Sequence, residues 1–268
     1  MFLTLLASTM PPMTTAIIRP VSRSIQECEL THMDRDPICY ETACAQHQAY
    51  VEALESLGVT VIELDPLHHH PDAVFVEDIA VVCDDVAILT RPGAESRRGE
   101  VESITPILSA HRPLAHIEDP ATLEGGDVLL AERTFYIGRS SRTNDAGIDQ
   151  FRSIVTPYGY EVVAVDVPGA LHLKTAATYL GEGRLLANPE WIDMDGLEDL
   201  ELIAVHPDEP FAGNVVRIGE VMLFPKQFPH TAGRLEARGI QLIQVPSTEL
   251  AKAEGSLTCK SVIFQANA

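Results

Sequence analysis

The sequence predicts an α/β protein: a single five-bladed, pseudo-symmetric α/β propeller built from units of a β-hairpin, a helix and a further strand. The main observation is a repeat. In five places a polar residue with a chemically useful side chain stands just before a short apolar stretch that ends at a turn. These residues are Glu77, Glu124, His172, Asn214 and Cys259, which follow one another at intervals of 47, 48, 42 and 45 positions. A near-constant interval of this length indicates a repeated supersecondary unit, and five such units can bury their strands by closing around an axis.

The elements of each unit follow from the hydrophobic periodicity and the turn signals. The strands are short apolar stretches, and the helices show apolar residues at helical spacing. We expect every unit, the third included, to contain all three parts. The predicted hairpins turn at 84–85, 132–133, 181–183 and 219–220, the helices lie near 101–108, 146–155 and 231–238, and the later strands cover 114–117, 162–165, 203–205 and 240–245.

The fifth unit is predicted to be split between the two ends of the chain. Residues 259–264 supply its first strand and residues 16–18 its second, and a helix and a strand over 37–64 follow. Pairing of the two ends would seal the propeller. We therefore expect one domain over residues 14–268, with residues 1–13 as a disordered N-terminal extension.

Composition and charge restrict the function classes. The 268 residues include 39 acidic and 19 basic residues, a formal charge of −20, which argues against nucleic acid and anionic membranes as partners and suits a cationic small ligand. The apolar run at 2–7 is too short to span a bilayer. Five scattered cysteines without a CxxC pair argue against a disulfide framework or a closed zinc site and favour a reducing cytoplasm. The histidines at 68–70 cannot all face one ion, so we expect a loop there.

The hairpin starts of a propeller converge at one end of its axis, which would bring Glu77, Asp78, Glu124, His172, Asn214 and Cys259 into one cleft. A cysteine beside a histidine and carboxylates suggests a nucleophilic thiolate with an acid/base partner. A buried structural cysteine and a core histidine are the alternatives. Carboxylates at the start of apolar strands are costly to leave unpaired, and a planar guanidinium would satisfy several of them.

Two arginines and one long loop complete the candidate site. Arg97 and Arg142 lie just beyond the ends of two hairpins. Each could hold a substrate carboxylate through its bidentate fork, and a solvated surface position is an equal alternative. The polar loop at 22–36 is too long to be idle in a compact domain, so we interpret it as a substrate lid.

Several motifs, taken together and in order, resemble a known family. They are Phe75-Val-Glu-Asp78, Arg91-Pro-Gly-Ala-Glu-Ser-Arg97-Arg98, Leu123-Glu-Gly-Gly-Asp127, Arg142-Thr-Asn144, Leu171-His-Leu-Lys174 and Leu257-Thr-Cys259. The chain resembles the dimethylarginine dimethylaminohydrolases (dimethylargininases) of the guanidino-modifying (pentein) superfamily. This resemblance implies hydrolysis of Nω-methylated L-arginine to citrulline and methylamine or dimethylamine, without a metal or organic cofactor.

The resemblance also implies a role for each site residue. Cys259 would attack the guanidinium carbon, giving an S-alkylthiouronium intermediate, and His172, oriented by Glu124, would act as acid and then as base. The remaining assignments concern substrate binding. Asp78, with Glu77 beside it, would hold the guanidinium, Asp72 and the backbone of Leu30 the α-amino group, and Arg97 and Arg142 the α-carboxylate.

Other functions stay open at this level. The same Cys, His and acid could serve an arginine deiminase or an amidinotransferase, and a propeller could also be a non-catalytic binding module. The pocket around the guanidinium would discriminate between the enzymes, and its size cannot be read from the sequence. A homodimer is common for a soluble enzyme of this size.

Overall fold

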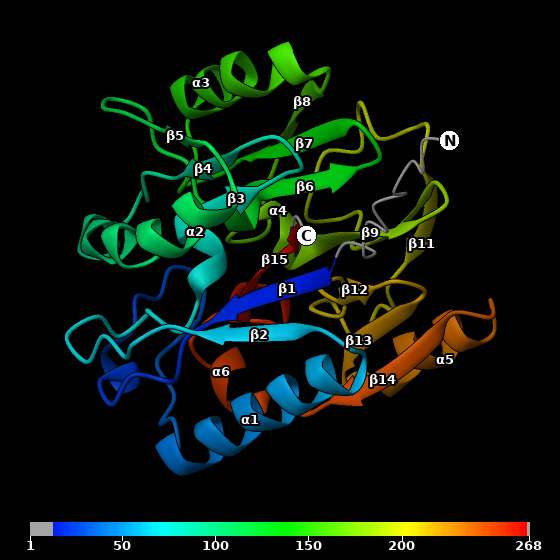
Figure 1. Ribbon diagram of the computed structural model, residues 1–268. Coiled ribbons are helices and arrows are strands. Elements are labelled where there is room, and N and C mark those ends of the chain that lie inside the picture. The colour runs from blue at the N-terminus through cyan, green and yellow to red at the C-terminus, as the bar shows by residue number, and fades with distance from the viewer. Residues whose placement is uncertain (1–12, 267–268) are drawn as a thin grey trace, which may run out of the picture.

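The computed structural model describes residues 13–266 and contains five three-stranded sheets (Figure 1). In each sheet the first two strands are antiparallel and the third runs parallel to the second. Blade 1 is β3 (Ala80–Val82), β4 (Ala87–Leu89) and β5 (Leu114–His116); blade 2 is β6 (Val128–Ala131), β7 (Thr134–Arg139) and β8 (Glu161–Asp166); blade 3 is β9 (Ala177–Gly181), β10 (Arg184–Ala187) and β11 (Glu201–Ala204); blade 4 is β12 (Val216–Ile218), β13 (Val221–Pro225) and β14 (Gln241–Val245). The predicted five-bladed α/β propeller is confirmed.

Blade 5 joins the two ends of the described chain, as predicted. Its strands are β15 (Ser261–Ala266), β1 (Met13–Ile18) and β2 (Thr60–Glu63). Ile18 pairs with Ser261 in the antiparallel ladder, and Thr15 pairs with Thr60 in the parallel one. The predicted extension at 1–13 lies outside the described residues, except for Met13, which begins β1.

The longer helices lie on the outside of the blades (Figure 1). They are α1 (Tyr40–Ser56), α2 (Thr105–His111), α3 (Asp145–Val155) and α5 (Pro229–Glu236). The two short helices are α4 (Leu173–Ala176), which packs against the start of blade 2 near the centre of the molecule, and α6 (Thr248–Ala251), which packs against α1. Apolar clusters fill the space between neighbouring sheets, one joining blades 2 and 3 and another joining blades 3 and 4. Among residues 13–266, no helix is both long and apolar enough to cross a membrane.

The expectation of a helix in every unit is wrong for blade 3. The connection from β10 to β11 consists of turns. Side chains there bond to nearby backbone, since Asn188 accepts from the Glu190 amide at 3.1 Å and Asp193 from the Asp195 amide at 3.0 Å. Such local bonds compete with helical ones, and Gly196 adopts a left-handed φ of 85° that ends any regular run.

A one-turn helix precedes the first strand in four of the five blades. These are η2 (Val76–Ile79), η4 (Gly125–Asp127), α4 and η6 (Thr258–Lys260). Cys259 therefore lies in η6, and the strand predicted to begin with it starts two residues later. The further 3-10 helices are η1 (Ile25–Glu27), η3 (Glu95–Ser103) and η5 (Thr156–Tyr158).

The segments just before the first strand of each blade are called the blade starts. Glycines allow them to approach one another backbone to backbone. A Cβ on Gly125 would lie 2.0 Å from the carbonyl oxygen of Glu77, and a Cβ on Gly213 would lie 2.3 Å from that of Ala176. No other residue fits at such a distance. The close approach places the side chains of neighbouring blade starts at one end of the axis.

Lys260, next to the predicted nucleophile, is completely buried. Its ammonium donates to Ser247 Oγ at 2.9 Å and lies 5.2 Å from the centre of the Tyr50 ring, and no carboxylate within the described residues pairs with it. Burial lowers the pKa of Lys260 from 10.5 to about 7. Because the folded-state pKa lies below the unfolded one, the penalty on folding grows as the pH falls below 10.5 and is complete below about pH 7.

We expect Lys260→Met to raise the free energy of unfolding at pH 7 by a few kcal/mol, since it removes the cost of burying an amine without a carboxylate. The gain should shrink as the pH approaches 10.5. Urea unfolding at pH 7 and near pH 10.5 measures this gain in stability, with the exposed Lys226→Met as control. A loss of stability at pH 7 would contradict this account.

Candidate active site

The blade starts bring four predicted residues to one end of the propeller. Asp78 lies in η2, Glu124 caps η4, His172 caps α4 and Cys259 lies in η6. All four are buried. A small cavity of about 20 Å³ is lined by Asp78, Glu124, Cys259 and Leu171, the residue before His172, together with Asp72, Arg97 and Arg142.

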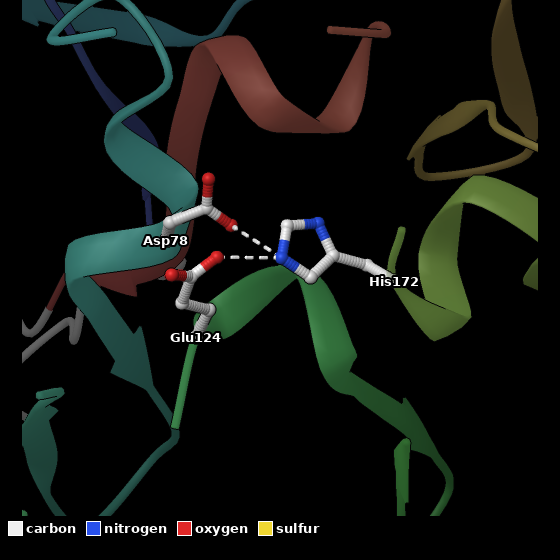
Figure 2. A group of neighbouring side chains, drawn as sticks. All are labelled: Asp78, Glu124 and His172. Carbon is white, nitrogen blue, oxygen red and sulfur yellow. Dashed lines mark hydrogen bonds and ion pairs between the residues drawn. The ribbon is translucent and has the colours of Figure 1, made fainter. Parts of the chain in front are cut away.

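His172 forms a buried ion pair with Glu124 (Figure 2). Its Nε2 lies 2.7 Å from Glu124 Oε2 and 4.0 Å from Asp78 Oδ1. Burial alone would lower the His172 pKa, but the carboxylates of Asp78, Asp127 and Glu124 outweigh it and raise that pKa to about 9. Burial opposes ionisation of Glu124 as well, yet the His172 contact holds the Glu124 pKa at about 2. The pair is therefore charged at neutral pH.

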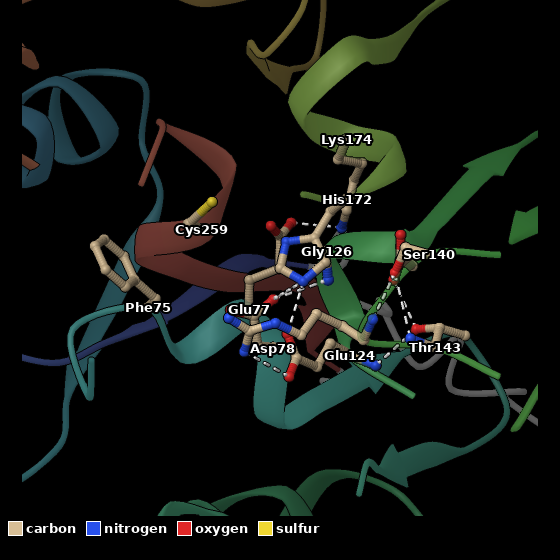
Figure 3. Close-up of polar contacts among 12 residues, drawn as sticks. Phe75, Glu77, Asp78, Glu124, Gly126, Ser140, Thr143, His172, Lys174 and Cys259 are labelled. Atoms are coloured by element: carbon tan, nitrogen blue, oxygen red, sulfur yellow. Dashed lines mark hydrogen bonds and ion pairs between the residues drawn. The ribbon is translucent and has the colours of Figure 1, made fainter. Parts of the chain in front are cut away.

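Cys259 carries a protonated thiol at neutral pH. Its Sγ accepts from the Ser256 amide at 3.4 Å, and Figure 3 shows the sulfur directed to the side on which the His172 ring lies. Burial, reinforced by the negative charges of Glu77 and Asp78, raises the Cys259 pKa to about 12. A bound cation would oppose these effects and favour the thiolate.

Glu77 faces away from the small cavity. Its carboxylate pairs with Lys174 Nζ at 2.5 Å and accepts from Thr258 Oγ1 at 2.7 Å. Asn214, the candidate residue of blade 4, holds these partners by donating to the Lys174 carbonyl at 2.7 Å and accepting from the Thr258 amide at 3.0 Å. Glu77 and Lys174 line a second cavity of about 400 Å³, so the ion pair stands between the two spaces.

Arg97 is buried among protein acceptors. It pairs with Asp78 Oδ2 at 2.5 Å and with Glu100 Oε2 at 2.9 Å, and it also donates to the Phe75 carbonyl at 2.9 Å. The alternative of a solvated surface arginine is thereby excluded. Most of its donors are occupied, which leaves few for a ligand.

Arg142, Asp72 and Leu30 lie on the loop side of the small cavity. Arg142 lies 3.5 Å from Glu124 Oε1 and donates to Thr31 Oγ1 at 3.0 Å. Asp72 accepts from the Glu29 amide at 3.1 Å, and burial raises its pKa to about 6. Leu30 packs against the apolar cluster beneath the loop.

Asp127 is a site residue for which the sequence analysis predicts no role. Its carboxylate accepts from the Leu173 amide at 2.9 Å and from the hydroxyls of Ser140 and Thr143, each at 2.6 Å. Thr143 in turn accepts from the Glu124 amide at 3.2 Å (Figure 3). Asp127 thus fixes the backbone beside His172 and Glu124 together. The signal was its place in the Leu123-Glu-Gly-Gly-Asp127 run, but its donors come from other elements.

Gly126 is required for close packing beside the ion pair. A Cβ there would lie 2.6 Å from His172 Nδ1 and 2.8 Å from Asp78 Oδ1. Its amide donates to Asp78 Oδ1 at 3.0 Å. The absence of a side chain lets the imidazole and the Asp78 carboxylate share this space.

Asp78, Glu124 and His172 could in composition hold a metal ion, because one ligand atom of each lies within 4.8 Å of the others. The geometry argues against it. Glu124 bonds directly to His172, and Asp78 bonds to Arg97, so an ion would have to displace both contacts beside a guanidinium. That the reaction needs no metal stays a prediction.

The stabilisation from the His172–Glu124 pair depends on pH. The folded-state pKa of His172, about 9, lies above its ordinary 6.5. The stabilisation that comes from charging His172 is therefore complete below pH 6.5 and is lost as the pH rises through 9. The folded-state pKa of Glu124, about 2, lies below its ordinary 4.5. The stabilisation that comes from ionising Glu124 is therefore complete above pH 4.5 and is lost as the pH falls through 2. Both contributions to stability are complete between pH 4.5 and 6.5.

Glu124→Gln should therefore lower the free energy of unfolding by roughly 3 kcal/mol at pH 5.5, since it breaks a buried ion pair. The loss should be smaller at pH 9.5. Urea unfolding at both pH values measures it, with the exposed Glu95→Gln as control. An equal loss at the two pH values would show that His172 is not charged in the folded protein.

Comparison with known proteins places the chain in a family. The family model described as N,N dimethylarginine dimethylhydrolase, eukaryotic, matches residues 23–261. The N(G),N(G)-dimethylarginine dimethylaminohydrolase of Streptomyces coelicolor is 39% identical over 252 residues, which cover 94% of this chain and 97% of the relative. The enzyme of that name from Pseudomonas aeruginosa is 37% identical, over 84% of this chain and 89% of the relative.

Solved structures agree. A cysteine-to-serine mutant of the Pseudomonas aeruginosa enzyme, complexed with citrulline, superposes with a TM-score of 0.88 at 34% identity. The match covers 95% of this chain and 100% of the mutant's chain. The N-terminal domain of a cyanobacterial arginine dihydrolase, 19% identical with a TM-score of 0.85, covers 95% of this chain and 98% of its own and shares the fold alone. Because both sequence and fold match, the chain belongs to the dimethylarginine dimethylaminohydrolase family.

Proposed function

We propose that this protein hydrolyses Nω-methylated L-arginine to L-citrulline and methylamine or dimethylamine. The observation that carries the proposal is a buried thiol, an imidazolium and carboxylates gathered at one end of the propeller in a chain of this family. The citrulline in the solved relative is the expected product of such a reaction.

In the first half-reaction the substrate activates its own nucleophile. The guanidinium, bound beside Asp78, lowers the Cys259 pKa, and the thiol proton leaves to solvent. The thiolate attacks the guanidinium carbon and forms a C–S bond. His172, protonated at neutral pH, donates its proton to the methylated nitrogen as the C–N bond breaks. Glu124 holds Nε2, so Nδ1 is the nitrogen that we assign to this transfer.

In the second half-reaction the same imidazole, now neutral, acts as a base. It takes a proton from water as the water oxygen bonds to the carbon of the S-alkylthiouronium intermediate. The C–S bond then breaks and the sulfur leaves as thiolate. The second proton of the water leaves the oxygen, which gives citrulline, and the thiolate takes up a proton to restore the thiol. Glu124 stabilises each imidazolium stage because it remains ionised throughout.

Substrate recognition follows from charge. Asp72 and the backbone carbonyl of Leu30 suit the α-amino group, and Arg142 suits the α-carboxylate because it lines the cavity on the loop side. We assign Arg97 the remaining contact to the carboxylate through the one Nη1 hydrogen that its bonds to Asp78, Glu100 and the Phe75 and Asp72 carbonyls leave free. Glu77 supports the guanidinium end indirectly, since its carboxylate bonds to Lys174 and Thr258.

Deimination of unmethylated arginine is the second candidate, because an arginine dihydrolase domain shares the fold. Its 19% identity gives no support beyond that. Amidino transfer and a non-catalytic binding module have no observation in their favour. A homodimer, a cytoplasmic location and the absence of nucleic-acid or membrane partners stay predictions.

Citrulline release from asymmetric dimethylarginine and from arginine, assayed side by side, tests the proposal. We expect turnover of the methylated substrate and a fall in kcat of roughly a thousandfold or more in Cys259→Ser, because the covalent step is lost. The exposed Cys39→Ser is the matched control and should keep its activity. Citrulline from arginine alone, or full activity in Cys259→Ser, would contradict the proposal.

A further inference from the structure

A loop segment over residues 28–36 covers the small cavity. Its Glu29 amide bonds to Asp72, and Thr31 Oγ1 accepts from Arg142. Glu29 Oε1 also accepts from Ser96 Oγ at 2.7 Å. The enclosed space of about 20 Å³ has room for about one water molecule. A substrate of amino-acid size does not fit there unless part of the lining moves, and we expect this segment to be that part.

The Glu254 carboxylate makes the strongest hydrogen-bonded contact to the segment. It accepts three consecutive backbone amides: Thr31 at 3.0 Å, His32 at 2.5 Å and Met33 at 2.7 Å. Consecutive amides that converge on one anion form a backbone nest, and bonds to a charged acceptor are about twice as strong as neutral ones. Asp72, Ser96 and Arg142 each make a single hydrogen bond to the segment, and Gln26 bonds to its far end, at Arg35 and Asp36.

The backbone at Glu254 is itself unusual. Its φ of 56° lies in the left-handed region, which a residue with a Cβ adopts at a cost. This conformation lies between α6 and η6, and Glu254 also lines the small cavity. The strained position is five residues before Cys259, so the carboxylate connects the segment that carries the nucleophile to the loop that covers it.

We propose that Glu254 is a positioning residue that holds the 28–36 segment closed over the reacting groups. Its bonds to Thr31–Met33 fix the backbone immediately after Leu30, whose carbonyl we assign to the substrate α-amino group. Substrate must break or strain these three bonds to enter, and their return encloses the guanidinium with Cys259 and His172. The kinetic part of this inference rests on the proposed function, whereas the structural part does not.

Amide hydrogen exchange without substrate tests the structural part. In Glu254→Ala we expect the amides of Thr31, His32 and Met33 to exchange on the order of tenfold faster or more, because three bonds to a charged acceptor are lost. Glu254→Gln should give an intermediate change. The exposed Glu236→Gln, which also removes one negative charge, should leave these amides unchanged. Equal protection in wild type and Glu254→Ala would overturn the proposal.

Glu254→Gly separates the carboxylate from the backbone strain. Glycine adopts the left-handed φ without cost, so this variant loses the carboxylate but not the chain path. We expect the same fast exchange as in Glu254→Ala. Protection that returns in Glu254→Gly would show that the left-handed turn, and not the carboxylate, fixes the segment, and would overturn the proposal.

Steady-state kinetics with asymmetric dimethylarginine test the functional part. We expect Glu254→Ala to raise KM by roughly tenfold with a smaller effect on kcat, the pattern for loss of an interaction that holds bound substrate. A fall in kcat at unchanged KM would overturn the positioning role. If the wild type does not turn over this substrate, the proposed function fails, and hydrogen exchange still decides whether Glu254 fastens the segment.

Discussion

The buried ion pair between His172 and Glu124 is the interaction on which the site depends. Two charges removed from water are costly, and their attraction compensates only when the remaining lone pairs and protons are satisfied. The second oxygen of Glu124 accepts from the Ala94 amide at 3.3 Å and lies 3.5 Å from Arg142. Asp127 fixes the backbone on both sides of the pair by bonding to the amide after His172 and, through Thr143, to the amide of Glu124. The fold therefore has to place the starts of blades 2 and 3 correctly before the pair can exist.

The charges around this pair explain the choice of ligand. Asp72, Asp78 and Glu124 face the small cavity with two arginines, and Cys259 stays protonated among these carboxylates. A resting thiol is a poor nucleophile toward most electrophiles. Reactivity then depends on a cation of the right shape reaching the carboxylates, which ties chemical activation to recognition.

The sequence was sufficient for the architecture because the evidence for it is local. The spacing of polar residues before apolar stretches predicts five units, and their closure predicts that Glu124, His172 and Cys259 converge. The helix expected in blade 3 was wrong because side-chain bonds at Asn188 and Asp193 favour turns, and periodicity does not register such bonds.

The supporting contacts could not be predicted, since their partners are distant along the chain. Asp127 receives its donors from Ser140, Thr143 and Leu173, and Glu254 receives its donors from residues more than 200 positions earlier. The pairing of Arg97 with Asp78 likewise depends on how blade 1 packs. A single sequence reports which side chains exist, but not which of them face one another.

The pairing of β1 with β15 has a consequence for how the protein forms. The first and last described strands share one sheet, so the ring closes only after β15 has been made. Contacts of such long sequence separation slow folding, because chain entropy is lost before they are gained. The reactive sulfur, carried just ahead of β15, is thus among the last groups to be enclosed, and a nascent chain holds the other four blade starts without a nucleophile.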